Sequence, residues 1–142
     1  MTADDPYDLQ RFVAAQAPVI AQVLAELRAG AKRTHWMWFV FPQVSGLGAS
    51  AMARRYAISS LDEAKAYLAH PVLGQRLRDG TQLVLDVKGR TAREIFGAPD
   101  DLKFRSSMTL FARAAPGGGP FEAALETYFA GRDDPLTLER LT

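Results

Sequence analysis

The sequence predicts an all-α fold, a compact orthogonal bundle of about six to eight short helices in a single domain spanning residues 1–142. Three observations favour this class. Apolar residues recur at helical spacing along most of the chain, capping residues and prolines separate these runs, and no second segment is convincing as a strand. A chain of 142 residues, 48% of them hydrophobic, is long enough for one core and too short for two independent ones.

The first two helices are expected on either side of Pro18, which separates them. Before it, four residues share one helical face: Leu9, Phe12, Val13 and Gln16. After it, an apolar stripe follows the i, i+3, i+4, i+7 spacing: Ile20, Val23, Leu24 and Leu27. Gly30 follows this stripe as a C-terminal cap, because glycine readily adopts the left-handed conformation.

The aromatic stretch His35–Gln43 holds both tryptophans and is the segment around which the fold is expected to pack. So much aromatic surface belongs in the core or against a cavity. Local rules conflict here, since Trp, Phe and Val favour a strand, whereas Thr34 is placed to cap a short helix that Pro42 stops. A lone strand would lack a backbone partner, which favours the helix.

Capping signals indicate where helices begin in the middle of the chain. After a loop at 44–50 and a helical turn at 51–56, Ser60 and Glu63 form the pattern of a capping box that opens a helix ending at His70-Pro71. A longer helix is expected over 72–87, with these residues inward: Leu73, Leu77, Val84 and Val87. Thr91 and Glu94 form a second capping box.

The C-terminal part predicts three more elements. A helix beginning near 99–101 has acidic residues at the positive end of its dipole and presents an apolar face of Phe104, Met108 and Phe111. Residues 115–120 are expected to form a surface loop and 121–129 a helix that Gly131 ends. Asp134-Pro135 is typical of a cap and first position, here for a last helix through Leu141.

Composition excludes several function classes. The formal charge is +1 with no basic run longer than a pair, so neither nucleic acid nor a membrane surface is an expected partner. The absence of cysteine removes disulfides, thiolate nucleophiles and zinc–thiolate sites. No apolar run approaches the roughly 18 residues of a membrane span, and the acidic start of the chain is unlike a signal peptide. We therefore expect a cytoplasmic protein without a cofactor.

Motifs spread over nearly the whole chain support a family resemblance: Asp5–Phe12, Lys32–Gln43, Tyr56–Ile58, Glu63-Ala64, Tyr67-Leu68, His70-Pro71, Leu73-Gly74, Asp101–Lys103 and Ser106–Phe111. With these motifs the chain resembles the domain-of-unknown-function 1810 family, and the tryptophan block is the most specific part. The resemblance implies a mostly or wholly α-helical domain and no established activity. A calpastatin label on some members does not fit, because calpastatin-type inhibitors are disordered and this sequence is patterned for a core.

The aromatic stretch also supplies candidate site residues. His35 is a weak candidate for general acid–base catalysis, since imidazole titrates near neutral pH; the alternative is a helix-start histidine bonded to backbone. Trp38 is a candidate for stacking a planar ligand, with core packing as the alternative. Trp36 and Trp38 are two apart and point in different directions, so at most one is expected to face a ligand. Gln43 can bond either a ligand or its own loop.

A second candidate group lies near the C-terminus: Lys103, Arg105, Ser106 and Thr109. Lys103, Ser106 and Thr109 share a helical face apart from the apolar stripe. Cations and hydroxyls grouped in this way suit a phosphate or carboxylate, although a solvated helix face has the same composition.

Two other patterns are rejected. Gly46–Ala51 matches the dinucleotide-binding fingerprint in its letters, but a helix-dominated chain has no parallel sheet to hold it. No metal site is expected, because His35 and His70 are far apart and the paired aspartates stand beside prolines as helix caps.

Two functional hypotheses remain. In the first, the aromatic stretch shares a pocket with the helix that carries Ser106 and Thr109, here called the hydroxyl-rich helix, and the pocket binds a small anionic or nucleotide-like ligand. The nucleotide idea rests on analogy with the small helical NADAR N-glycosidases, whose motif does not align here. In the second, the protein is a non-enzymatic interaction or homo-oligomerising module with an exposed apolar patch. Whether the domain is an enzyme, and in which oligomeric state it exists, is left open by the sequence.

Overall fold

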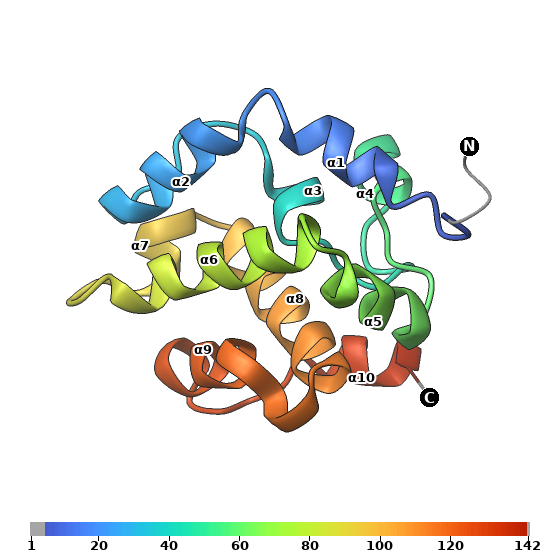
Figure 1. Ribbon diagram of the computed structural model, residues 1–142. Helices are drawn as coiled ribbons and strands as arrows, with labels where there is room; N and C mark the ends of the chain where they lie inside the picture. The colour runs from blue at the N-terminus through green and yellow to red at the C-terminus, as the bar shows by residue number, and fades with distance from the viewer. Residues whose placement is uncertain (1–4, 142) are drawn as a thin grey trace.

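The computed structural model describes residues 5–141, and in this range the chain forms helices and no strands (Figure 1). The elements in order are α1 (Gln10–Gln16), α2 (Ile20–Ala29), α3 (Met37–Val40), α4 (Ala51–Arg55), α5 (Leu61–Ala69), α6 (Leu73–Asp86), α7 (Ala92–Phe96), α8 (Asp100–Ala114), the 3-10 turn η1 (Pro116–Gly118), α9 (Gly119–Phe129) and α10 (Pro135–Leu141). The predicted all-α class is confirmed. The helices outnumber the expected six to eight because α3, α4 and α7 are pieces of only four or five residues.

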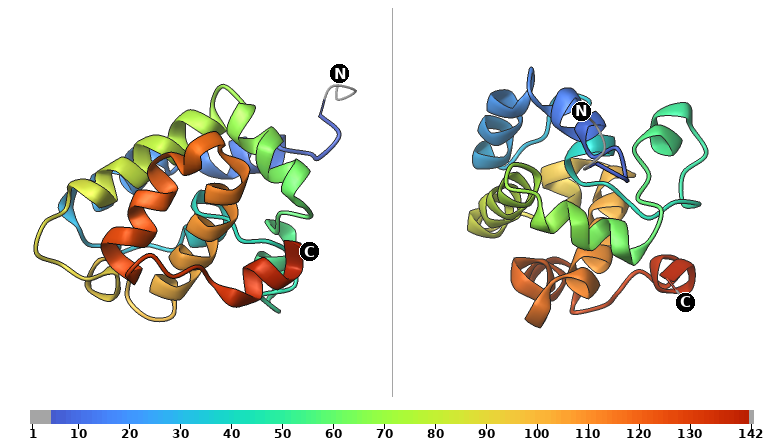
Figure 2. Two further views of the ribbon diagram at one scale, coloured as in Figure 1. Left: turned by 90° about the horizontal axis from the view of Figure 1, so that it is seen from below. Right: turned by 45° about the vertical axis from the view of Figure 1, so that its right-hand side comes forward.

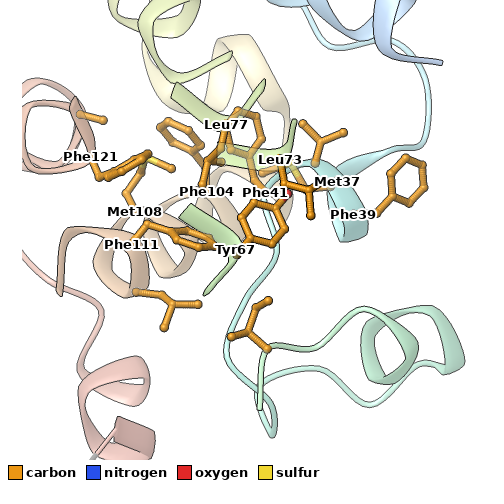
Figure 3. Close-up of a cluster of buried hydrophobic side chains, with 14 of the residues drawn as sticks. Met37, Phe39, Phe41, Tyr67, Leu73, Leu77, Phe104, Met108, Phe111 and Phe121 are labelled. Carbon is orange, nitrogen blue, oxygen red and sulfur yellow. The ribbon is translucent and has the colours of Figure 1, made fainter. Parts of the chain in front are cut away.

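Helix α8 lies at the centre of the molecule and packs against α5, α7, α9 and α10 (Figure 1). Its predicted apolar face is confirmed, since Phe104, Met108 and Phe111 are fully buried. Figure 3 shows these side chains gathered with aromatic residues from other elements. The ring centroid of Phe104 lies 5.1 Å from that of Phe41 and 4.5 Å from that of Phe96. The aromatic stretch therefore packs directly on α8.

The aromatic stretch forms a single helical turn, α3, between non-helical segments. The helical interpretation is confirmed for this turn, and Pro42 lies just beyond it. After the turn, the chain pairs with residue 58 in an isolated parallel bridge, in which the Ile58 amide donates to the Gln43 carbonyl at 2.9 Å. The prediction of Thr34 as a cap is wrong, because α3 has no side-chain cap and the Thr34 hydroxyl bonds to Glu26 instead.

Most of the predicted helix signals hold. Gly30 ends α2 in the left-handed conformation with φ of 72°, and Thr91 with Glu94 forms the complete capping box of α7. The box at Ser60 is only half formed: Ser60 Oγ accepts from the Glu63 amide, but the Glu63 carboxylate turns to Ser59 and Arg11. The expected loop at 115–120 contains η1 and the start of α9.

The buried carboxylate of Glu26 joins α2 to the segment before α3. It accepts five hydrogen bonds: from Gln22 Nε2, the Arg33 amide, the Thr34 amide, Thr34 Oγ1 and Trp36 Nε1, at 2.6–3.0 Å. Burial by itself raises the pKa of Glu26, but the hydrogen bonds together outweigh it and lower the pKa to about 2. The carboxylate thereby fixes the course of residues 33–36 and the position of the Trp36 ring in the core.

Within residues 5–141, no single helix is long and apolar enough to cross a membrane; α1 and α2, which form a bent pair, reach that length and composition only together.

We predict that Glu26→Gln lowers the stability of the protein and flattens its acid dependence. Because the folded pKa of about 2 lies below the unfolded value of 4.5, the stabilisation is complete above pH 4.5 and is lost as the pH falls towards 2. The shift corresponds to on the order of 3 kcal/mol. Denaturant unfolding at several pH values measures it, with the exposed Glu126→Gln as control. Parallel pH profiles for Glu26→Gln and the unmodified protein would contradict this assignment.

Candidate functional site

Three adjoining hollows meet around Trp38, Gln43 and Lys103. We call them the lysine hollow, the leucine hollow and the small hollow, with volumes of about 390, 440 and 100 Å³. The lysine hollow is lined by Lys32, His35, Met37, Trp38, Phe96, Ala98, Pro99, Asp100 and Lys103. The leucine hollow is lined by Gln43, Leu47, Gly48, Ala49, Ser50, Ala53, Pro99, Leu102, Lys103, Arg105, Ser106, Asp134 and Leu136. The small hollow lies among Trp38, Gln43, Val44, Ser45, Gly46, Gly48, Ala53, Arg54, Tyr56 and Ala57.

Their shared linings make the hollows one surface region. Trp38 borders the lysine and small hollows, Gln43 the small and leucine hollows, and Lys103 the lysine and leucine hollows. The walls come from α3, α4, the N-terminal half of α8 and α10. Figure 2 shows α10 and the segment around α4 on the same side of the molecule. The structure thus brings the aromatic stretch and the hydroxyl-rich helix to a common face.

A cluster of two lysines and one aspartate lines the lysine hollow. Asp100 places one carboxylate oxygen 2.9 Å from Lys32 Nζ and the other 3.5 Å from Lys103 Nζ. The Lys32 side chain is only 7% exposed, against 30% for Lys103. The cluster sits at the first turn of α8, where the helix dipole adds positive potential. The Asp100 carboxylate therefore interacts with two ammonium groups and with the positive end of the α8 dipole.

The two tryptophans occupy different environments, as their spacing predicts. Trp36 is 1% exposed and donates its indole N–H to Glu26, so its ring belongs to the core. Trp38 is partly exposed and borders two hollows. The ammonium of Lys103 lies 5.9 Å from the centroid of the Trp38 ring, within the range of a cation–π contact. A planar group entering the lysine hollow meets an aromatic ring and a cation together.

The other candidates from the aromatic stretch border the same region. His35 is exposed and lines the lysine hollow beside Lys32 and Trp38. Gln43 is partly exposed, with its backbone carbonyl held by the Ile58 amide. This backbone bond fixes the position of Gln43 without using the side-chain amide.

The remaining candidates on α8 hold the segment that precedes α10. Arg105 donates to the carbonyls of Arg132 and Asp133 at 3.0 and 2.6 Å. Ser106 Oγ bonds to Asp134 Oδ2 at 2.8 Å, and Thr109 Oγ1 accepts from the Asp134 amide at 2.9 Å. Arg105 and Ser106 also line the leucine hollow, whereas Thr109 is fully buried and lines none of the three.

Sequence reasoning missed several lining residues. The sequence explains Asp100 as an acidic residue at a helix start. Its partner Lys32 lies 68 positions earlier in the chain, so no local pattern indicates the ion pair. The carboxylate that lines the hollow with His35 is Asp100, whereas Glu26 bonds to backbone amides and to Trp36. Leu102 and Leu136 were also missed, because an exposed leucine has no distinct sequence signal.

Neither of the rejected motifs gains support. Within residues 5–141, no group of three or more His, Asp or Glu side chains is arranged to hold a metal ion. Gly46–Ala51 leads into the short helix α4 and follows an isolated bridge, where a dinucleotide fingerprint requires a strand of a parallel sheet.

We predict that Thr109→Val destabilises the protein by about 1–3 kcal/mol, because the partly buried amide of Asp134 loses its acceptor. Denaturant unfolding measures the loss, and exposed Thr127→Val serves as control. Equal stability of the two variants would contradict the role of this hydroxyl.

The comparisons with known proteins support the family resemblance. A family model described as a protein of unknown function (DUF1810) matches residues 6–141. The crystal structure of the conserved hypothetical protein Rv1873 from Mycobacterium tuberculosis is similar, with a TM-score of 0.95 and 60% identity over 96% of this chain and 98% of that chain. A comparison with curated proteins gave no significant match. Because the family model covers nearly the whole chain, the protein belongs to the DUF1810 family of proteins of unknown function.

Proposed function

We propose that this domain binds a small anionic ligand with a planar, nucleotide-like group where the three hollows meet. The observation that carries the proposal is the partly exposed Trp38 ring with the Lys103 ammonium 5.9 Å from its centroid. An aromatic face offers stacking to any planar group, and the ammonium offers a charge to the anion attached to it. Gln43, at the edge of the same region, can bond the polar edge of the planar group.

The charge balance of the surface favours an anion. Four cationic side chains border the hollows, Lys32, Arg54, Lys103 and Arg105, against two carboxylates, Asp100 and Asp134. Asp134 is occupied by bonds to Ser106 and Thr137. The protein as a whole carries a formal charge of only +1, so the positive excess is local. A local excess raises the concentration of anions at this face.

The alternative is a non-enzymatic interaction or homo-oligomerising module. One observation favours it: Leu102 and Leu136 are 58% and 59% exposed and line the same hollow. Polar and charged groups nevertheless surround these leucines in a concave region, which suits a small ligand better than a flat protein contact. Sedimentation equilibrium over a wide concentration range tests the alternative, which predicts a dimer that Leu136→Ser dissociates.

We predict that AMP and related nucleotides raise the melting temperature of the protein, and that this effect is weakened in two variants. Trp38→Ala removes the stacking surface. Because stacking a base on an aromatic ring contributes about 1–3 kcal/mol, we expect AMP binding to weaken about five- to hundredfold. Lys103→Met removes the charge and is expected to weaken it roughly tenfold. A thermal-shift screen followed by calorimetric titration measures both.

The matched control is Lys65→Met, which removes an exposed charge on α5 outside the hollows. Melting curves without ligand show whether each variant is folded. A flat screen against nucleotides, sugar phosphates and acidic metabolites would overturn the proposal, and so would AMP binding that survives in both site variants.

We further predict that Asp100→Asn tightens AMP binding several-fold at low salt. In the free protein the carboxylate of Asp100 occupies the two ammonium groups that an anion would contact. Its removal frees both, and the gain should shrink as salt screens the lysines. The same variant is expected to be less stable, because Lys32 is nearly buried and loses its counter-charge. Asp62→Asn, in the first turn of α5, is the control; weaker AMP binding by Asp100→Asn would contradict the assignment.

A further inference from the structure

The leucine hollow carries an apolar surface that anion binding and stacking leave unexplained. Within residues 5–141, the exposed large hydrophobic residues are Val72, Leu102 and Leu136, and the two leucines line this one hollow from different helices. Single exposed leucines are ordinary, but two that border the same hollow form a common apolar wall. Leu47, partly buried, adds a third apolar side chain from the loop before α4.

The walls of the leucine hollow are held in place by specific contacts. Arg105 and Thr109 hold residues 132–134, from which α10 and Leu136 follow. On the opposite side, Gly46 in the loop before α4 lies next to the guanidinium group of Arg140 on α10. Ser50 caps α4 by accepting from the Ala53 amide at 3.1 Å. The hollow therefore exists before any ligand arrives.

The leucine hollow is continuous with the proposed binding surface. It shares Lys103 and Pro99 with the lysine hollow and Gln43 with the small hollow. Leu102 directly precedes Lys103 on α8. An anion held by Lys103 therefore lies beside the apolar side chain of Leu102. The cationic groups at the edge of the hollow, Lys103 and Arg105, complement a ligand that is negative at one end.

We propose that the leucine hollow is an apolar subsite for the same ligand, which is then an amphiphilic anion: a planar group bearing a carboxylate or phosphate and also an aliphatic chain. This inference rests on the proposed function. The anion lies at Lys103, the planar group faces Trp38, and the aliphatic chain covers Leu102 and Leu136. Transfer of the chain from water to this wall adds affinity in proportion to the apolar area buried.

A series of 4-alkylbenzoates tests the subsite, because each member keeps the planar anion and only the chain length changes. Benzoate, 4-propylbenzoate and 4-hexylbenzoate are titrated into the protein by calorimetry. We expect the affinity to rise about two- to fourfold per added methylene until the hollow is filled, following the roughly 0.8 kcal/mol of a buried methylene. In Leu136→Ser and Leu102→Ser the rise is expected to fall to less than half.

Two controls separate the subsite from general hydrophobicity. Val72→Ser changes an exposed apolar residue outside the three hollows and should leave the chain-length dependence intact. Because Leu102 and Leu136 are more than half exposed, their serine variants are expected to keep the melting temperature of the unmodified protein. Sedimentation in the same samples reports whether a second copy of the chain covers the leucines.

The outcomes distinguish this inference from the proposed function. Benzoate or AMP binding with no dependence on chain length would overturn the apolar subsite and leave the anion site standing. Absence of binding by AMP and by every benzoate would overturn both. A chain-length dependence that persists in both leucine variants, or a dimer that these variants dissociate, would also overturn the subsite.

Discussion

The hydrogen bonds that Glu26 accepts are the constraint on which both the core and the candidate site depend. A buried carboxylate is costly unless its lone pairs are used, and here two backbone amides, a hydroxyl, a side-chain amide and an indole N–H use them. These donors come from Gln22 on α2 and from residues 33–36. The hydrogen bonds therefore fix a single course for the chain that leads from α2 to residue 36. That course places Trp36 inside and, two residues later, Trp38 at the surface.

Helix α8 joins this aromatic segment to the rest of the molecule by dividing its residues between two tasks. The apolar face, with Phe104, Met108 and Phe111, forms the centre of the core. The polar residues interleaved with it hold residues 132–134 through hydrogen bonds, and Lys103 faces the hollows. A rigid central helix therefore sets the distance between the Trp38 ring, the cations and the leucines of the candidate site.

Much of the fold follows from local physics in the sequence. The helical spacing of Ile20, Val23 and Leu27, the left-handed Gly30 and the Thr91–Glu94 box need only neighbouring residues, and each was predicted. The different environments of Trp36 and Trp38 follow from their separation alone. The Ser60 box failed in part because Arg11, 52 residues away from Glu63, bonds to its carboxylate.

The site was less predictable, because its contacts join residues far apart in the chain. Trp38, Gln43 and Lys103 were singled out by residue type, and the structure brings them to one surface. The same reasoning does not show that Arg105 is bonded to carbonyls 27 and 28 residues later, or that Asp100 is divided between two lysines. Residue type suggests what a side chain is able to bind, whereas its actual partner depends on the tertiary packing.

The most direct measurement of the central claim uses the two tryptophans, the only ones in the chain. Their indole N–H groups give two signals in a ¹⁵N-correlated NMR spectrum, assigned with Trp38→Phe, and AMP is titrated while both are followed. The account predicts that the Trp38 signal shifts progressively to saturation while the Trp36 signal, held by Glu26, stays in place. An unmoved Trp38 signal, or equal shifts of both, would contradict it.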